Sequence, residues 1–252
     1  MKPLKIAVWG VGAMGAGIAR AIGEKPALEI VGAVDTDPAK IGRPLSDFTG
    51  LGAREQVPVV ASLEEAMPAD PDLVVIATAS LVRDVFPRVM EVLENGKAVI
   101  TTAEEMAYPW PAEPELCAQI DAAAREKGVA VLGTGINPGF VMDLLPIVMS
   151  AACTDVKRVR VTRVNDLAPF GPTVLREQGV GLTEEAFRRG VSEGKVEGHV
   201  GFVQSIAMVS DALGLGVDRI EQFREPIVSG VLREEKGIVV EPGMVAGCRQ
   251  TG

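Results

Sequence analysis

The chain has 252 residues, which suggests one large domain or two modest ones, and its formal net charge is −9. Such an acidic chain disfavours a nucleic-acid partner. It contains no apolar run of about 18 residues or more, so we predict no membrane span, and its N-terminus lacks the layout of a signal peptide. The three cysteines show no CxxC spacing, which argues against a metal site or a disulfide framework and favours a cytoplasmic protein.

In the first half of the chain, short apolar runs alternate with helix-like segments. Residues 72–77 (DLVVIA) are almost wholly apolar, as expected for a central parallel strand that is covered on both faces. Strands are predicted at 5–9, 28–34, 57–60, 72–77, 98–101 and 129–132, and helices at 13–22, 82–94 and 113–126. This alternation predicts an α/β fold, a Rossmann-type domain with a parallel sheet over residues 1–135.

The pattern changes after Gly133. Residues 157–164 (KRVRVTRV) largely alternate polar and apolar side chains, which predicts a half-exposed strand of a mostly antiparallel sheet. Helices are predicted from Asn137-Pro138 to about 152, at 183–189 and at 201–213, strands at 219–223 and 238–240, and a loop at 169–182. We therefore expect residues 136–252 to form an α+β substrate and dimerisation domain.

Two further expectations concern this second domain. Its half-exposed strand and later strands could pair across a two-fold axis, so we predict a homodimer. The chain also ends within what resembles the middle of an element, so we expect a C-terminal segment to be missing.

A glycine-rich loop follows the first predicted strand directly. Gly10, Gly12 and Gly15, with Ala13 and Met14 between them, form a GxGxxG sequence that opens a helix. The first glycine permits a tight turn, the second lets the backbone approach a pyrophosphate, and the third lets helix and strand pack closely. The helix N-terminus then offers free N–H groups to the phosphates. In this context the loop predicts a nicotinamide dinucleotide site; a turn that only packs a strand on a helix is the alternative.

An acidic residue follows the second predicted strand. Asp35 lies roughly 20 positions after Gly15, the spacing at which a carboxylate binds the adenosine ribose hydroxyls. Its charge should repel a 2′-phosphate, which favours NAD. Lys40 and Arg43 lie nearby and could accept NADP instead, so the cofactor is predicted as NAD or NADP.

Small residues follow two central strands. Thr78 and Ala79 follow residues 72–77, and Thr102 follows 98–101. Because open parallel sheets bind ligands outside the carboxyl ends of their strands, we predict that these residues contact the nicotinamide half of the cofactor. Helix capping is a compatible interpretation.

Two adjacent acids come just past the same sheet edge. Glu104 and Glu105 could bind a substrate ammonium group or serve as catalytic acid and base. The competing interpretation is a solvated helix start, where acids are favoured.

Five residues near and beyond the domain boundary are further candidates. Asn137 could hold the nicotinamide amide, and the predicted helix start at Asn137 and Gly139 could bind a substrate carboxylate. Asp143 suits the same helix start and is a second candidate for substrate binding. Arg163 could pair with the substrate carboxylate. His199 is the only histidine and a candidate general acid–base, although a structural histidine is the alternative.

Longer motifs resemble a known family. TTAEEMAYPW at residues 101–110 and GTGINPGFVMD at 133–143 are similar to the 2,4-diaminopentanoate dehydrogenase branch of the dihydrodipicolinate reductase superfamily, and the similarity continues at GHVGF, residues 198–202. The resemblance implies oxidative deamination at C4 of 2,4-diaminopentanoate, giving 2-amino-4-oxopentanoate, ammonia and reduced cofactor. A single histidine excludes the paired-histidine motif of the reductases that make tetrahydrodipicolinate.

Three functions follow from these observations. The first is the NAD(P)-dependent amine dehydrogenase, which needs a small amino acid as substrate. The second is another oxidoreductase of the superfamily, such as an imine reductase or an amino acid dehydrogenase. The third is a non-catalytic dinucleotide sensor, which would bind cofactor without turning over any substrate.

Overall fold

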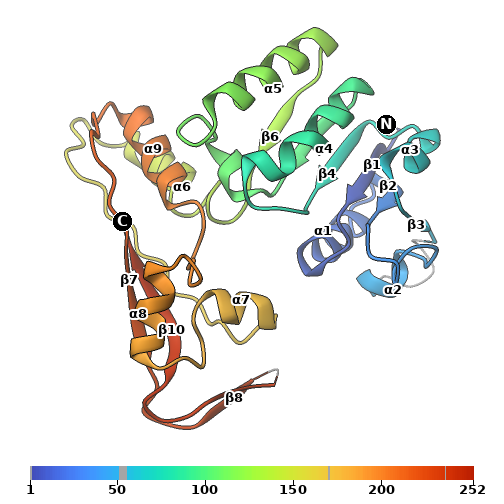
Figure 1. Cartoon of the computed structure of the whole chain (residues 1–252). Helices are drawn as coiled ribbons and strands as arrows, with labels where there is room; N and C mark the ends of the chain where they lie inside the picture. Colours follow the sequence, from blue (N-terminus) through green and yellow to red (C-terminus); the bar gives the residue numbers. More distant parts are fainter. Residues whose placement is uncertain (1, 51–55, 170, 236) are drawn as a thin grey trace. The chain divides into compact units, whose positions relative to one another are not determined.

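The computed structural model describes residues 2–50, 56–169, 171–235 and 237–252. By contacts within the chain it divides into two compact units, Met1–Phe140 and Val141–Gly252, called unit 1 and unit 2 here. Figure 1 labels their helices and strands.

Unit 1 is built on a sheet of six parallel strands. These are β1 (Leu4–Trp9), β2 (Leu28–Val34), β3 (Val59–Val60), β4 (Leu73–Ile76), β5 (Ala98–Thr101) and β6 (Val131–Gly133). Their order is β3-β2-β1-β4-β5-β6, and each neighbouring pair is parallel (Figure 1). This is the strand order of the doubly wound dinucleotide-binding fold. The predicted Rossmann-type domain is confirmed.

Helices connect these strands. They are α1 (Ala13–Gly23), α2 (Ser46–Thr49), α3 (Leu63–Ala66), α4 (Val82–Glu94) and α5 (Pro114–Lys127), with short 3₁₀ helices η2 (Met67–Ala69) and η3 (Glu104–Ala107). Successive residues of one strand enter different apolar clusters: Val8 of β1 packs in the cluster that includes Ile22 of α1, whereas Trp9 packs with Val85 of α4. The sheet is therefore covered on both faces, which explains its continuously apolar central strands.

Unit 2 combines four helices with two antiparallel strand pairs in its described residues. The helices are α6 (Leu144–Ser150), α7 (Pro172–Glu177), α8 (Glu184–Ser192) and α9 (Phe202–Leu213). The strands are β7 (Phe223–Val228), β8 (Arg233–Glu235), β9 (Ile238–Val240) and β10 (Val245–Thr251), with β7 paired to β10 and β8 to β9. Phe187, Val196 and Val245 form its buried apolar cluster. The predicted α+β fold with antiparallel pairing is confirmed.

The helix predicted from Asn137-Pro138 begins later than expected. Residues 137–143 form turns, and the helix α6 starts at Leu144 with Asp143 as its N-cap. Gly139 has φ +115°, which an α-helix cannot accommodate. The proline therefore marks a turn here rather than the first turn of a helix.

The strand predicted at 157–164 was wrong. The structure shows no strand over these residues. The exposure of their side chains nevertheless alternates, because Val159, Val161 and Arg163 are half-buried and their neighbours in sequence are exposed. A period of two thus identifies which side chains face the protein, but a strand also needs a neighbour for its backbone hydrogen bonds.

Two other assignments also shifted. The predicted loop at 169–182 contains α7, where Pro172 occupies the first helical turn instead of breaking a helix. The strand predicted at 219–223 lies instead at Phe223–Val228, and β8 and β10 were not predicted. These short strands of unit 2 are defined by their pairing, which local sequence patterns do not reveal.

Candidate active site

The N-terminus of α1 is open. Gly12 is its N-cap, and no side chain caps it among the residues that the structure describes. A Cβ built on Gly12 would meet nothing within 4 Å, and Ala13 and Met14 are exposed. The first N–H groups of this helix therefore face open space, which suits a pyrophosphate.

The other two loop glycines are enclosed. A Cβ on Gly15 would lie 1.7 Å from the carbonyl oxygen of Gly10. Gly10 itself has φ +100°, and its Cβ would lie 2.5 Å from the carbonyl oxygen of Ala77. These two glycines hold the turn against the helix and against the end of β4, while Gly12 leaves room outside it.

Asp35 lies beside this loop and is almost buried. Its Oδ2 accepts hydrogen bonds from the Val11 backbone N–H at 2.7 Å and from Lys40 Nζ at 2.9 Å, and its Oδ1 accepts one from the Asp37 N–H at 2.9 Å. Burial by itself raises the pKa of Asp35. The three hydrogen bonds, led by the one from Lys40, together lower the pKa by more than burial raises it, so it lies below its ordinary value. The carboxylate is therefore held as an anion and aimed at the glycine loop.

The two nearby cations differ in their surroundings. Lys40 pairs with Asp35 at 2.9 Å. Arg43 pairs instead with Asp47 at 2.9 Å and lies over the ring of Phe48. Lys40 is thus the cation beside the predicted ribose position.

The carboxyl ends of the central strands meet next to the glycine loop. The N–H of Ala77 donates to the carbonyl of Trp9, and the N–H of Thr102 donates to that of Ile76. Thr78 is exposed, and Ala79 and Thr102 are half-buried. The structure brings these predicted residues together at one edge of the sheet, where such folds bind ligands.

Glu105 caps a neighbouring helix. Its Oε2 accepts a hydrogen bond of 2.8 Å from the N–H of Val82, the first residue of α4, and its own N–H donates to the carbonyl of Ser80 at 3.1 Å. The N-cap of α4 is Leu81, which has no side-chain hydrogen-bond acceptor. Glu105 thus supplies the missing cap and places a negative charge at a helix N-terminus.

Glu104 has different surroundings. It is half-buried at the start of η3, and its carboxylate forms no hydrogen bond or ion pair within the described ranges. A half-buried carboxylate without a partner at the carboxyl edge of the sheet is able to bind a cation or accept a proton.

The loop of Asn137 is tightly folded. A Cβ on Gly133 would lie 1.9 Å from the carbonyl oxygen of Met106, and one on Gly139 would lie 2.4 Å from the N atom of Gly135. These close approaches account for the glycines through packing within unit 1. Asn137 and Gly139 remain predicted ligand residues.

Asp143 joins two helices of unit 2. It is completely buried, its Oδ1 accepts a hydrogen bond of 2.7 Å from the N–H of Leu144, and its Oδ2 accepts one of 2.7 Å from the hydroxyl of Ser205 on α9. These contacts give Asp143 a structural role; substrate binding by Asp143 stays a prediction.

His199 precedes α9 and is half-buried. Its ring lies edge-on to Phe202, with centroids 6.4 Å apart. The side chain of Gln250 contacts the backbone of His199. Gln250 Oε1 accepts a hydrogen bond from the His199 N–H at 2.7 Å, and Gln250 Nε2 donates one to the His199 carbonyl at 3.1 Å. Sequence reasoning missed Gln250, because only the pairing of β7 with β10 brings it there.

Arg163 lies in the extended segment that was predicted to be a strand. Its guanidinium forms no hydrogen bond or ion pair with any residue that the structure describes, and it is half-buried. A half-buried cation without a carboxylate partner is suited to bind an anion.

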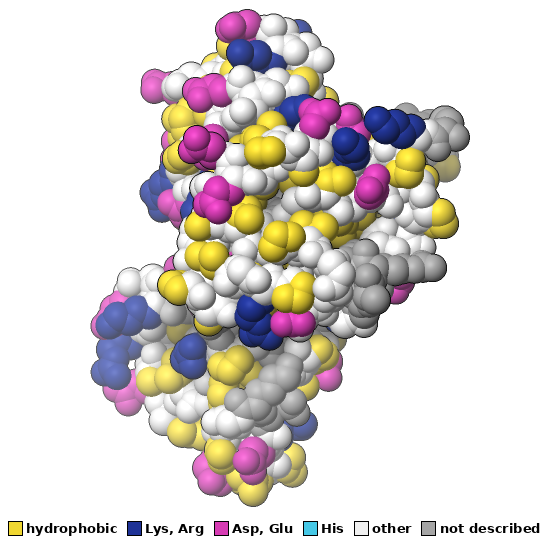
Figure 2. Space-filling model, turned by 90° about the vertical axis from the view of Figure 1, so that its right-hand side faces the viewer, with side chains coloured by type: hydrophobic (Ala, Val, Ile, Leu, Met, Phe, Trp, Pro, Cys, Tyr) yellow, Lys and Arg dark blue, Asp and Glu magenta, His cyan; other side chains and the backbone are white. Residues whose placement is uncertain are grey.

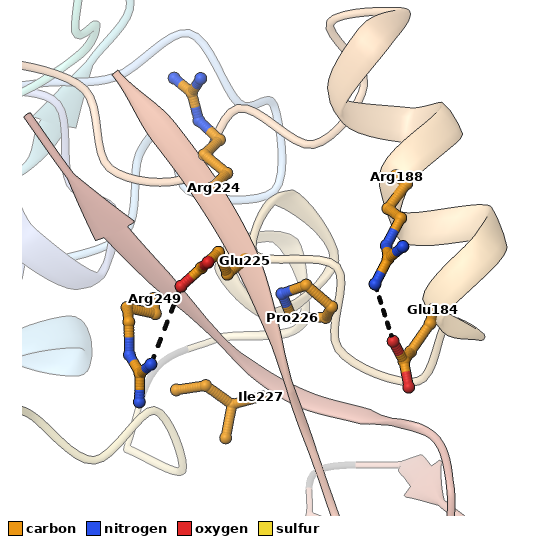
Figure 3. Close-up of a pocket in the computed structure, with 7 residues that line it drawn as sticks. All are labelled: Glu184, Arg188, Arg224, Glu225, Pro226, Ile227 and Arg249. Atoms are coloured by element: carbon orange, nitrogen blue, oxygen red, sulfur yellow. Dashed lines mark hydrogen bonds and ion pairs between the residues drawn. The ribbon is translucent and has the colours of Figure 1, made fainter. Parts of the chain in front are cut away.

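Unit 2 also has an open surface hollow of about 510 Å³ (Figure 3). It is lined by Glu184, Arg188, Arg224, Glu225, Pro226, Ile227 and Arg249. Two of its arginines already pair with glutamates, Arg188 with Glu184 at 3.1 Å and Arg249 with Glu225 at 3.8 Å. None of the predicted site residues lines it.

Charged side chains, helix lengths and possible metal ligands were compared over the described residues. On the face drawn in Figure 2, basic and acidic side chains lie interspersed among apolar ones. No described helix is long and apolar enough to cross a bilayer. No group of three or more histidine, cysteine or acidic side chains suitable for a metal ion was found among the described residues.

Comparison with known proteins identifies the family. A model of the 2,4-diaminopentanoate dehydrogenase C-terminal domain matches residues 140–252, and a model of an oxidoreductase family with an NAD-binding Rossmann fold matches residues 4–134. A 2,4-diaminopentanoate dehydrogenase of Acetoanaerobium sticklandii is 44% identical over 100% of this chain and 72% of its own length. An amine dehydrogenase of Streptomyces virginiae is 28% identical over 65% of this chain and 46% of its own length.

A solved structure agrees with these matches. The structure of an amine dehydrogenase from Mycobacterium smegmatis superposes with a TM-score of 0.82 at 27% identity, covering 98% of this chain and 73% of that one. These relatives are all named dehydrogenases, and the first is matched over the whole chain. The chain therefore belongs to the 2,4-diaminopentanoate dehydrogenase family of NAD-binding oxidoreductases.

Proposed function

We propose that this chain oxidises the C4 amine of 2,4-diaminopentanoate to 2-amino-4-oxopentanoate. The observation that carries the proposal is the 44% identity, over the whole chain, to a relative named for that substrate. In the balanced reaction, the substrate ammonium, water and oxidised cofactor give the ketone, an ammonium ion, reduced cofactor and one proton.

The residues around the glycine loop fit a nicotinamide dinucleotide. The open N-terminus of α1 at Gly12 would bind the pyrophosphate, and Asp35 the adenosine ribose. Thr78, Ala79 and Thr102 would line the nicotinamide half. When bound, the cofactor accepts the hydride that leaves C4 of the substrate.

NAD is the proposed preference. Asp35 is held as an anion by its hydrogen bonds, and a 2′-phosphate would bring further negative charge next to it. Lys40 offsets part of that repulsion. We expect a higher kcat/KM with NAD than with NADP. The ratio of kcat/KM for NAD to kcat/KM for NADP should fall in Asp35→Ser and rise in Lys40→Met.

Glu104 is the proposed general base. It would take a proton from the C4 ammonium group, so that the nitrogen lone pair can assist departure of the hydride. After releasing that proton to solvent, the carboxylate would accept a proton from the water that attacks the imine carbon. Support comes from its carboxylate, which has no partner within the described ranges, whereas that of Glu105 already accepts the N–H of Val82.

Five residues are proposed to bind the substrate or assist the proton transfers. Arg163 would bind the carboxylate of the diamino acid through two parallel hydrogen bonds. His199 would contact the substrate and act as a second acid–base group. Asn137, Gly139 and Asp143 remain candidates for orienting the amino acid.

The test is cofactor reduction, followed by absorbance, with 2,4-diaminopentanoate and either NAD or NADP. We expect Glu104→Gln to lower kcat by about 10²- to 10⁴-fold and Glu105→Gln to keep most activity, because the Gln amide oxygen can still accept the Val82 N–H. The reverse result would make Glu105 the base. Cofactor binding without turnover of any amine would favour a dinucleotide sensor.

A second candidate is an amine dehydrogenase that needs no substrate carboxylate. The matches to two proteins named amine dehydrogenases favour it. A kcat/KM for 2,4-diaminopentanoate no better than for a simple secondary-alkyl amine would select this candidate over the first.

We also propose that the protein is a cytoplasmic homodimer. Its three cysteines are free thiols, as expected in reducing surroundings. Among the residues that the structure describes, each two-stranded pair in unit 2 leaves edges without a strand neighbour, and such edges pair readily with another chain.

A further inference from the structure

Two side chains of the β7/β10 pair hold three backbone groups of residues 197–199, just before α9. Gln250 contacts both polar atoms of the His199 backbone, at 2.7 Å to its N and 3.1 Å to its O. Only one orientation of the Gln amide satisfies both contacts, since its oxygen must accept and its nitrogen must donate. The same nitrogen also donates to Gln222 Oε1 at 3.1 Å, which fixes that orientation further.

Arg224, on the neighbouring strand β7, contacts the same backbone segment. Its Nε donates a hydrogen bond of 2.7 Å to the carbonyl of Glu197. Arg224 and Gln250 are direct partners in the antiparallel register of β7 and β10, so their side chains lie on the same face of the strand pair. Figure 3 shows Arg224 pointing away from the Glu225–Arg249 ion pair on the other side of β7.

The residue between Glu197 and His199 is a glycine in a conformation that other residues rarely adopt. Gly198 is buried with φ +70°, and a Cβ there would lie 2.6 Å from Gln250 Oε1 and 3.0 Å from Arg224 Nε. Because Gly198 has no side chain, Gln250 Oε1 and Arg224 Nε can both approach the backbone on either side of it. The glycine at 198, its left-handed conformation and the register of β7 with β10 together fix the position of the His199 backbone.

We propose that Gln250 and Arg224 are positioning residues that fix His199 for the reaction. The inference rests on the role of His199 in the proposed function. A side chain whose backbone is held at both polar atoms has less freedom to leave its productive geometry, and a displacement of about 1 Å costs up to about a hundredfold in rate. The strand pair β7/β10 would therefore set the efficiency of a residue that lies outside the sheet.

The test uses the fact that the chain has one histidine. In tag-free protein the imidazole Cε1–H gives a single NMR signal, which reports the surroundings of His199 without any substrate. We expect Gln250→Ala and Arg224→Ala to shift this signal and its titration. The matched control is Arg249→Ala, on the same strand and exposed, which should leave both unchanged. An unaltered signal in Gln250→Ala would overturn the proposal.

Activity supplies the second readout. We expect Gln250→Ala to lower kcat/KM for the diamino acid between about ten- and a hundredfold with the KM for the cofactor unchanged. In a His199→Ala background the same substitution should have no further effect, because a positioning residue acts only through the residue it positions. Multiplying effects would indicate a general structural role and contradict the proposal.

Two further outcomes separate this inference from the proposed function. If His199→Ala kept the parental kcat/KM, His199 would have no role in the reaction, and its contacts with Gln250 and Arg224 would have no functional consequence. The proposed dehydrogenase activity would stand, because cofactor reduction would continue. If Gln250→Ala fails to fold, Gln250→Glu keeps an acceptor for the His199 N–H but loses the donor to the His199 carbonyl and to Gln222 Oε1. An unchanged signal and unchanged kcat/KM in that variant would equally overturn the proposal.

Discussion

Individual glycines of the dinucleotide loop do different physical work, and the structure separates them. Gly15 is enclosed, because its Cβ would lie 1.7 Å from the Gly10 carbonyl oxygen, whereas a Cβ on Gly12 or Gly17 would meet nothing within 4 Å. The sequence motif treats Gly12 and Gly15 alike. Their surroundings predict that one is needed for folding and the other for ligand approach.

Alanine substitutions test this distinction. We expect Gly15→Ala to lower the free energy of unfolding by about 1–3 kcal/mol through overpacking and to abolish cofactor binding. Gly12→Ala should change stability by at most about 1 kcal/mol but weaken cofactor affinity, since its methyl group enters the pyrophosphate position. Gly17→Ala, in the same helix, should stabilise by about 0.5–1 kcal/mol and bind normally. Denaturant unfolding and calorimetry measure both quantities; equal losses of stability in all three variants would refute the assignment.

The Asp35–Lys40 pair predicts a pH dependence of stability. The folded-state pKa of Asp35 is lowered, so its contribution is present above the ordinary aspartate value of about 3.9 and is lost as pH falls through the folded pKa. Lys40→Met removes the leading cause of the lowering, so the pKa of Asp35 should rise. The variant should therefore be less stable near neutral pH and approach the parent in acid.

Unfolding by denaturant at a series of pH values measures that difference. Arg43→Met is the control, because its partner Asp47 is exposed and the pair should contribute little. A stability difference for Lys40→Met that stays constant from neutral to acid would show that Lys40 acts through packing of its aliphatic chain instead.

At the scale of helices and strands, the elements that sequence predicted best carry their own local cause. The helix α4 was predicted at its full extent, because an apolar stripe and a terminal Asn-Gly are both local signals. The helix α8 likewise begins where Thr183 accepts the N–H of Ala186. The predictions for residues 157–164 and for β10 failed for opposite reasons. Residues 157–164 alternate polar and apolar side chains but have no strand partner, whereas β10 has β7 as its partner but no clear alternation.

The same distinction applies to the candidate site. The glycine loop and Asp35 were predictable because their spacing follows from the fold's own geometry. The cap formed by Glu105 on α4 and the contact of Gln250 with His199 were not, since the paired groups lie 23 and 51 positions apart. Such contacts depend on tertiary structure, which residue type alone does not reveal.

The buried contact between α6 and α9 gives the element-scale prediction. Ser205 donates to the completely buried carboxylate of Asp143 at 2.7 Å. Ser205→Ala removes one hydrogen-bond donor from a buried carboxyl group and should lower the free energy of unfolding by about 1–3 kcal/mol. Ser192→Ala, at the exposed end of α8, is the matched control and should change it by less than about 0.5 kcal/mol. Equal values in denaturant unfolding would mean that Asp143 does not depend on Ser205.

For the whole molecule, the exposed apolar side chains of unit 2 bear on the proposed homodimer. Val231, Leu232 and Val239 are half or more exposed, at 56%, 60% and 50%, and they lie on or beside the β8/β9 pair. Single exposed apolar residues are common on monomers, but clustered ones mark interaction surfaces. A strand pair with exposed edges adds backbone groups that a second copy could pair with.

Light scattering of the purified chain tests this directly. We expect a mass twice the 26.5 kDa of one chain, and the double variant Val231→Glu, Leu232→Glu should shift it toward 26.5 kDa, because a buried interface cannot accept two unpaired carboxylates. Val217→Glu, at an exposed apolar position outside these strands, should leave the mass unchanged. A monomeric parent would refute the homodimer, whereas a dimer that survives the double variant would place the interface elsewhere on the chain.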